Sequence, residues 1–317
     1  MALSTHPLMP STNRPPSRVA IRCAADYAGD LGGIIFETLR EFRLPVEGKT
    51  VLLKPNLVQA DPDCVINTHP AVISATRESF LRLGAARVLI GEGPGHERDT
   101  EGILEAIRLR EWIEQLENHF VDLNLDDIKK VALRTRASKL HELYLPVSVL
   151  AADFFVSMPK MKTHHWVGAT LSLKNLFGVV PGSCYGWPKN VLHWAGIENS
   201  ILDLATTVRP DFAIIDGIIA MEGNGPIQGK PKASGVLVMG DDPVAVDATA
   251  ARVMGFAPER MGYLSKAGYV LGHVREEKIQ QIGEKLLRVR KRFEVLEPFY
   301  GLIEHLSDNT PSHSDTE

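Results

Sequence analysis

The sequence of 317 residues contains only three cysteines, Cys23, Cys64 and Cys184, which lie far apart and form no Cys-x-x-Cys pair. This scarcity excludes a disulfide scaffold, a four-cysteine zinc site and a self-contained four-cysteine iron–sulfur site. We therefore expect no iron–sulfur cluster within this chain. Few cysteines are also typical of a reducing compartment, so we expect a cytoplasmic protein.

The sequence also lacks long apolar runs and an excess of positive charge. No apolar segment approaches the ~20 residues of a membrane span, so we expect no membrane partner. The formal net charge is −4, which provides no global basic field to attract nucleic acid. With 44% hydrophobic and 23% charged residues, the composition is that of an ordinary globular protein.

Standard catalytic signatures are missing as well. The chain has no Gly-x-Ser-x-Gly or His-Glu-x-x-His motif, and its glycine-rich segment 91–96 lacks a Walker lysine and the Gly-x-Gly-x-x-Gly spacing. The histidines and aspartates leave room for a divalent metal, but their spacing specifies none. The sequence therefore leaves the identity of any cofactor open.

Short apolar segments alternate with amphipathic ones along the chain. We expect strands at residues 19–23, 50–54, 87–91, 152–157, 212–215 and 236–239, and helices at residues 31–42, 70–83 and 244–254. This alternation predicts an α/β fold with a mostly parallel sheet flanked by helices in three layers, with room for a smaller inserted subdomain. The domain is expected to span residues 18–305, between disordered tails at 1–17 and 306–317.

Residues 154–197 contain no Asp or Glu over 44 positions, although about five would be expected from the composition. This carboxylate-free segment holds four lysines, three histidines and three of the four tryptophans: Lys160, Lys162, Lys174, Lys189, His164, His165, His193, Trp166, Trp187 and Trp194. Clustered cations repel one another, and a phosphate or carboxylate ligand would relieve that repulsion. Alternatively, the lysines are surface residues that pair with carboxylates elsewhere in the chain.

His164 and His165 are adjacent, and neighbouring residues of a regular strand point to opposite faces. We therefore expect at most one of them to enter a given site.

Acidic residues follow several of the expected strands, where ligands bind in parallel sheets. Asp216 follows segment 212–215, and the loop 222–226 brings Glu222 with Gly223 and Gly225, whose backbone could approach an anion or simply turn. Asp247 lies inside the expected helix 244–254 and needs a partner unless it is exposed. Asp242, with Pro243 after it, is expected to cap that helix.

Three further segments end an expected strand or open a helix. Lys54 and Asn56 follow the second strand, Glu92 follows the strand at 87–91, and Thr68 or His69 is expected to cap the helix that begins at Pro70. The N-terminus of that helix could also bind an anion.

Several ordered motifs together resemble the family called "domain of unknown function 362". They are LLKPNLV (52–58), THP (68–70), GEG (91–93), PKMKTHHWVGATLSLKNLFGVVPG (159–182), His193, IIDG (214–217), MEGNGP (221–226) and DDPVAVDATAARVMG (241–255). The resemblance covers residues 50–256 and implies an α/β fold. Some members of that family carry a ferredoxin-like cluster module, which this chain lacks. The resemblance thus implies, as an alternative, a redox accessory protein that uses a cluster from a protein partner.

A second resemblance is to nickel-pincer lactate racemases, which use a His, then a Lys, then another His in a similar α/β setting. His164, Lys174 and His193 follow that order, and His69 could match an earlier histidine. It implies racemase- or epimerase-like chemistry as another alternative.

From these patterns we predict a protein, with enzyme activity left open, that binds a small anionic metabolite or cofactor. A nucleic-acid binder ranks last, because glycine- and proline-rich loops after strands favour a small-molecule cavity. The predicted catalytic residues are His164, Lys174, His193 and Asp216, with the histidines in acid–base roles. The predicted ligand-binding residues are Lys54, Asn56, His69, Glu92, Lys160, Lys162, Asn175, Glu222, Gly223, Gly225 and Asp247.

Overall fold

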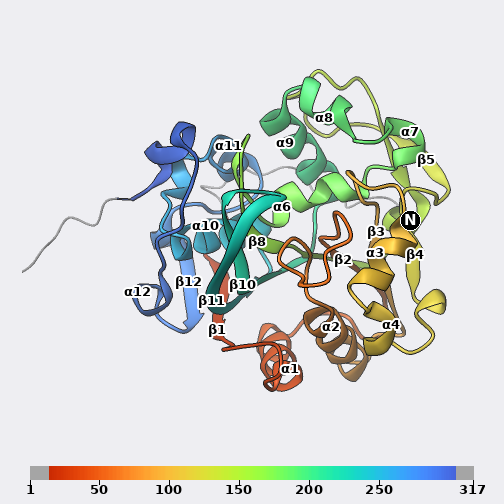
Figure 1. The fold of residues 1–317 in the computed structure, drawn as a ribbon, viewed down its shortest axis with the longest axis horizontal. Coiled ribbons are helices and arrows are strands. Elements are labelled where there is room, and N and C mark those ends of the chain that lie inside the picture. The colour runs from red at the N-terminus through yellow and green to blue at the C-terminus, as the bar shows by residue number, and fades with distance from the viewer. Residues whose placement is uncertain (1–13, 305–317) are drawn as a thin grey trace, which may run out of the picture.

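A computed structural model describes residues 14–304 of the chain. Residues 1–13 of the predicted N-terminal tail, and the whole predicted C-terminal tail at 306–317, lie outside the described residues. Ser17, the last residue of the predicted N-terminal tail, is the first residue of strand β1. Within the described part, ten strands form one sheet in which eight follow the order β12-β1-β11-β10-β7-β2-β3-β4 (Figure 1). The bounds of these eight are Ser17–Cys23 (β1), Thr50–Pro55 (β2), Arg87–Glu92 (β3), Phe120–Asp122 (β4), Phe154–Met158 (β7), Phe212–Asn224 (β10), Gln228–Gly240 (β11) and Ile279–Gly283 (β12).

Most neighbouring strands of the sheet are parallel. The pairs β10–β7, β7–β2, β2–β3, β3–β4 and β1–β12 are parallel, whereas β11 is antiparallel to both β1 and β10. Two further strands, β8 (Lys160–His164) and β9 (Gly168–Thr170), extend from β10. A separate two-stranded sheet contains β5 (Ile128–Val131) and β6 (Leu143–Pro146). The predicted α/β fold with a mostly parallel sheet is confirmed.

Helices cover both faces of the sheet. Alternate residues of β2 show this arrangement, because Val51 and Leu53 belong to one apolar cluster and Leu52 to the other. The first cluster contains apolar residues of α1 to α4, and the second contains those of α9 to α11 (Figure 1). The helices are α1 (Leu31–Phe42), α2 (Pro70–Arg82), α3 (Thr100–Ala106), α4 (Leu109–Trp112), α5 (Val147–Ala151), α6 (Ser172–Asn175), α7 (Gly182–Tyr185), α8 (Asn190–Trp194), α9 (Ile197–Val208), α10 (Pro243–Val253), α11 (Gly262–Val270) and α12 (Leu286–Val289).

The predicted helix starts follow from side-chain caps. His69 precedes α2, and its Nδ1 accepts a hydrogen bond from the Ala71 N–H at 3.1 Å. Asp242 precedes α10 and accepts from the N–H groups of Val244 and Ala245. In both helices proline occupies the first turn, where it removes no intrahelical hydrogen bond. The two predicted caps are confirmed.

One strand extends well beyond its predicted end at residue 215. Strand β10 does not end before Asp216 but continues to Asn224, and its second half pairs with the equally long β11. Asp216 therefore lies within a strand rather than in a loop at its end. The polar residues and glycines of this half obscure the pattern of a strand, which here depends on pairing with β11 and an irregularity between Gly217 and Ile219. Segment 160–164, for which no element was predicted, forms strand β8.

None of the helices within residues 14–304 has the length and apolar character required to cross a membrane.

Candidate functional site

A cavity of about 340 Å³ lies beyond the carboxyl ends of β2 and β3 and beside β8. It is within the size range of small-molecule sites. Seven of the predicted site residues line it, namely Asn56, Glu92, Lys162, His164, Lys174, Asn175 and His193. The Oδ1 atom of Asn56 is buried and accepts no hydrogen bond from the described residues, so it is an unused acceptor in this wall.

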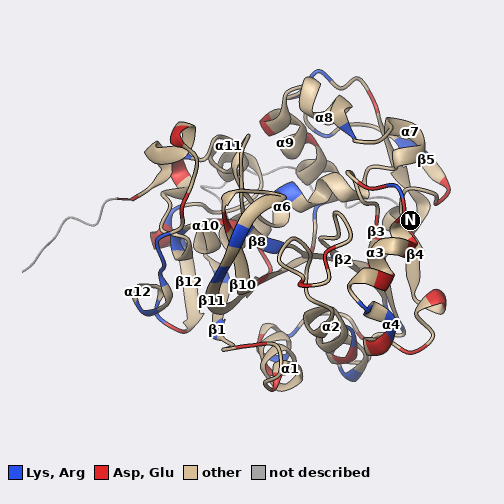
Figure 2. Ribbon diagram, viewed as in Figure 1, with Lys and Arg blue, Asp and Glu red and all other residues tan. Residues whose placement is uncertain are grey.

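Three lysines, Lys162, Lys174 and Lys189, line the cavity and are buried. Lys162 Nζ donates to the carbonyl oxygen of Ile66 at 2.8 Å, and Lys189 Nζ donates to that of Gly93 at 2.6 Å. Figure 2 places the lysine-bearing segments of β8 and α6 near the centre of the molecule. Several lysines within residues 14–304 form ion pairs with carboxylates, but none of these three does.

Lys174 differs from the other two lysines of the cavity. Its Nζ lies 3.7 Å from the centroid of the Phe177 ring, and no atom of residues 14–304 accepts a hydrogen bond from it. The side chain is only 9% exposed. The ammonium group, when charged, is thus stabilised by the face of one aromatic ring and by no anion.

Burial lowers the pKa values of all three lysines. Desolvation, with the nearby Lys54 charge, lowers the pKa of Lys174 to about 7. Desolvation also lowers the pKa of Lys189 to about 7, although Glu92 opposes this shift. The pKa of Lys162 is lowered well below its ordinary value by desolvation and by the charges of neighbouring lysines. These amines can therefore be neutral close to physiological pH.

His164, His165 and His193 all line this cavity. The prediction that at most one of His164 and His165 enters a given site is wrong, because β8 ends at His164 and a turn begins at the next residue. Strand alternation therefore does not extend to His165, and the two ring centroids are 5.1 Å apart. His165 is fixed by two contacts to Gly225, since its N–H and its Nδ1 both lie within 3 Å of the Gly225 carbonyl oxygen.

Two of these histidines are neutral at pH 7. Burial, followed by the charge of Lys174, lowers the pKa of His193 to about 4. The pKa of His164 is lowered well below its ordinary value by the same two causes. Its Nδ1 accepts a hydrogen bond from the Trp166 N–H at 3.1 Å. The His193 ring packs edge to face against that of Trp166, which is 53% exposed at the mouth of the cavity.

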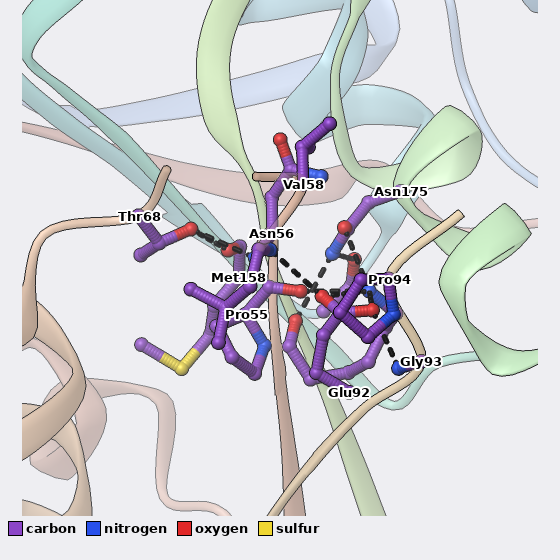
Figure 3. Close-up of polar contacts among 12 residues, drawn as sticks. Pro55, Asn56, Val58, Thr68, Glu92, Gly93, Pro94, Met158 and Asn175 are labelled. Atoms are coloured by element: carbon purple, nitrogen blue, oxygen red, sulfur yellow. Dashed lines mark hydrogen bonds and ion pairs between the residues drawn. The ribbon is translucent and has the colours of Figure 1, made fainter. Parts of the chain in front are cut away.

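A buried polar network forms the floor of the cavity. Lys54 Nζ donates to both carboxylate oxygens of Glu92, at 2.8 and 2.7 Å, and to Asn175 Oδ1 at 3.0 Å. The Glu92 carboxylate also accepts from the N–H groups of Leu57 and Gly93. Figure 3 shows Glu92, Gly93 and Asn175 meeting at this point. Because Glu92 is already paired with Lys54, none of the three cavity lysines has a carboxylate partner of its own within residues 14–304.

Gly178 is required by the close approach of the chain to this network. A Cβ atom at this position would overlap the Glu92 carboxylate and the Lys54 ammonium group. Glycine at position 178, the first residue of the segment GVVPG (178–182), therefore allows the backbone to pass directly over the Lys54–Glu92 ion pair.

A second cluster lies apart from the residues that line the cavity. It joins the fully buried Lys160 and Asp216 to the half-buried Tyr27 and His69. Lys160 Nζ donates to Asp216 Oδ2 at 2.8 Å and to Tyr27 Oη at 2.9 Å. The Asp216 carboxylate accepts from Tyr27 Oη and from the His69 N–H. The His69 ring stacks on Tyr27, and burial lowers its pKa to about 4. Lys160, Asp216 and Tyr27 are thus held by one another and by the backbone of His69 and Ile219, which is typical of a structural network.

The remaining predicted residues are engaged elsewhere. Glu222 pairs with Lys232 at 3.0 Å. The N–H groups of Gly223 and Gly225 donate to the carbonyl oxygens of Glu294 and Gly223, respectively. These donors are used within the protein and do not point to a ligand.

Asp247 is buried, and it accepts from the N–H groups of Ser172 and Leu173 at the start of α6. Desolvation raises its pKa to about 7 despite these hydrogen bonds. It therefore holds the helix that carries Lys174.

Three residues that line the cavity were not among the predicted catalytic or ligand-binding residues, namely Lys189, Phe177 and Trp166. The signal for Lys189 was present, because it belongs to the carboxylate-free segment. The packing of Phe177 against Lys174 depends on the turn after α6, which no local pattern specifies.

Residues 14–304 contain no group of three or more His, Cys, Asp or Glu side chains arranged to hold a metal ion. The three cysteines are free thiols, Cys64 being buried and Cys23 and Cys184 exposed.

Comparison with known proteins identifies one matching family and several similar chains. The model of the family "Domain of unknown function (DUF362)" matches residues 51–252. The "Thylakoid-associated protein sll1697" of Synechocystis sp. is 28% identical over 252 residues, which are 72% of this chain and 74% of that protein.

Two solved structures are similar at lower levels. The lactate racemase apoprotein from Thermoanaerobacterium thermosaccharolyticum has 15% identity and a TM-score of 0.46, over 76% of this chain and 57% of that one. A protein from Thermotoga maritima has 12% identity and a TM-score of 0.38, over 70% of this chain and 59% of that one. The present chain thus spans less than two thirds of the length of either of these two solved chains.

Proposed function

The chain belongs to the DUF362 family, and we propose that its cavity binds a small anionic metabolite or cofactor through a carboxylate or phosphate group. The observation that carries this proposal is the convergence of Lys162, Lys174 and Lys189 in one cavity whose only lining carboxylate, among the described residues, is already paired with Lys54. Isolated buried charges are expensive unless they are compensated. A bound anion would supply the missing charge.

Lys162 and Lys189 would hold the anionic group. Each is anchored by one backbone carbonyl and keeps two further N–H donors for a ligand. The unused Oδ1 of Asn56 would accept a hydrogen bond from a hydroxyl or amide of the same ligand. The exposed ring of Trp166 would cover the ligand at the mouth of the cavity.

Lys174 would exchange protons with the ligand. An acid–base group works best when its pKa is close to the working pH. The pKa of Lys174 is about 7, whereas that of His193 is about 4. Before the ligand binds, Lys174 is therefore better suited to this role than His193 or His164, to which the sequence pattern had given it. A bound anion would raise the pKa of all three groups.

Thermal unfolding in the presence of inorganic phosphate, and of a panel of small carboxylates, tests this proposal. Stabilisation by a ligand grows with its concentration relative to Kd. We expect stabilisation of the wild type and a loss of at least about tenfold in affinity in Lys162→Met and Lys189→Met, since a charge-assisted hydrogen bond contributes about 1.5–3 kcal/mol. The exposed Lys285 provides the matched control Lys285→Met. Equal ligand stabilisation in all four proteins would refute the assignment of the site.

Racemase- or epimerase-like chemistry is the second candidate. The observation in its favour is that His164, Lys174 and His193 line the same cavity. His69, the fourth residue of that pattern, lies in the separate cluster with Tyr27. Because no three metal-binding side chains come together within residues 14–304, we derive no step through nickel. Loss of optical rotation of a chiral 2-hydroxy acid, measured with and without Lys174→Met, tests this candidate.

The redox-accessory alternative and the cytoplasmic location remain predictions. Iron, sulfide and visible absorbance of protein purified without oxygen, alone and mixed with a ferredoxin, test the first. Cell fractionation tests the second, and a membrane fraction would be the contrary result, as the name of the thylakoid-associated relative suggests for that protein.

A further inference from the structure

The three lysines of the cavity are not equivalent. Lys162 and Lys189 each donate to a backbone carbonyl group, and Lys54 beneath them is fully engaged with Glu92, Asn175 and the Pro55 carbonyl group. Lys174 alone among these four has no hydrogen-bond acceptor within residues 14–304. The Lys174 side chain lines the cavity, where burial favours the neutral amine although the face of the Phe177 ring would stabilise the charged form, and no donor within residues 14–304 engages its lone pair.

A role as a simple anion-binding cation does not explain this arrangement. Lys162 and Lys189 already provide two donors that are fixed in direction by their carbonyl contacts. A third lysine that bound the same anion would be oriented better by a similar hydrogen bond to a backbone carbonyl group, and Lys174 has no such hydrogen bond within residues 14–304. An unpaired, desolvated amine beside other cations is instead the environment in which lysine acts as a nucleophile.

We propose that the Lys174 amine forms an imine with the aldehyde or ketone carbon of an anionic ligand, so that the cavity takes oxo acids or phosphorylated carbonyl compounds. This inference rests on the proposed function, because Lys162 and Lys189 hold the anionic group while Lys174 attacks the carbonyl carbon.

The step balances without any further reactant. The lone pair of the neutral amine forms the new C–N bond, and the electrons of the C=O double bond move to the oxygen. The nitrogen then loses its protons as the oxygen gains them, water leaves, and a C=N bond remains. Lys174 is the nucleophile in this step, so His164 and His193, which line the same cavity and whose lowered pKa values a bound anion would raise, are the groups that would transfer these protons.

Reductive trapping with glyoxylate tests this inference. Glyoxylate combines a carboxylate with an aldehyde, and sodium cyanoborohydride converts an imine into a stable secondary amine that mass spectrometry locates. At pH 7, we expect labelling of Lys174 to exceed that of an average exposed lysine by at least about tenfold, because far more of its amine is neutral. Acetaldehyde, which lacks the anionic group, is expected to label Lys174 more slowly, and inorganic phosphate is expected to suppress labelling by glyoxylate. Lys174→Met should lose the label, and Lys285→Met should keep it.

The outcomes distinguish this inference from the proposal on which it rests. If glyoxylate labels only exposed lysines while phosphate still stabilises the protein, the imine is refuted and anion binding stands. If Lys174 is labelled equally fast by acetaldehyde and phosphate neither stabilises nor protects, the amine is reactive but the anionic ligand class is refuted. If Lys174 is not labelled and phosphate has no effect, both fail.

Discussion

Replacing Lys174 by methionine should make the protein more stable, and the gain should depend on pH. Methionine matches the unbranched stem of lysine and packs well against the Phe177 ring. The pKa of Lys174 is about 7 in the folded protein, against an ordinary value of 10.5. Between these two values the unfolded chain holds a proton that the folded protein has released.

The sign and size of the effect follow from this difference in protons. Because the unfolded state binds more protons between pH 7 and 10.5, wild-type stability rises with pH there, and the destabilisation caused by Lys174 is greatest below pH 7. One proton over about two pH units corresponds to about 2–3 kcal/mol. The advantage of Lys174→Met over the wild type should therefore be about 2–3 kcal/mol larger at pH 6.5 than at pH 9.

Urea unfolding of both proteins at pH 6.5 and pH 9 measures this difference. His193, with a folded pKa of about 4 against an ordinary value of 6.5, is present in both proteins, so its own titration cancels when the two stabilities are compared at the same pH. Lys285→Met, at an exposed position, should have no such pH dependence. A constant stability difference at both pH values, or a variant less stable than the wild type at pH 6.5, would contradict the conclusion that Lys174 is a buried amine without a counter-charge.

Three further predictions concern the floor of the cavity and its charge. Glu92→Gln leaves the Lys54 ammonium group buried without its carboxylate and should destabilise the protein by about 3–5 kcal/mol in urea unfolding; the added change Lys54→Met should restore part of this loss. Gly178→Ala introduces a Cβ against the same ion pair and should cost about 1–3 kcal/mol; an alanine tolerated without loss would show that the pair can move aside. At pH 8, phosphate binding should take up protons, because the anion raises the lowered pKa of Lys174; calorimetry in buffers of different ionisation enthalpy measures this uptake, and identical heats would contradict it.

The sheet and its main helices were predictable because local patterns determine them. The run TVLLKP and the caps at His69 and Asp242 specify β2, α2 and α10 without long-range information. The extension of β10 was not predictable in this way. Gly217, Glu222 and Gly223 have low strand propensity, and only their pairing with β11 keeps them extended.

The candidate site was predictable in composition but not in the role of each residue. The carboxylate-free segment marked Lys162, Lys174 and Lys189 together, and the structure brings all three to one cavity. Lys160 belongs to the same segment, yet it pairs with Asp216 from β10, which lies 56 residues further along the chain. No local pattern distinguishes a lysine that will meet a distant carboxylate from one that will not.

Some of the buried lysines within residues 14–304 are paired with carboxylates and others are not, and this difference supports a functional role for the unpaired ones. The fold supplies carboxylates to Lys54 and Lys160, which are fully buried, so it is able to compensate buried cations. It supplies none to Lys162, Lys174 and Lys189 at the cavity wall, although the lack of a counter-charge destabilises the folded state. Among the described residues, the buried lysines that lack a carboxylate partner all line this one cavity, and a purely structural role would be served better by apolar side chains of the same size. A group that is kept in a position that lowers stability is expected to be needed for binding or reaction. If Lys162→Met and Lys189→Met stabilise the protein while they weaken phosphate binding, this argument holds; stabilisation with unchanged binding would contradict it.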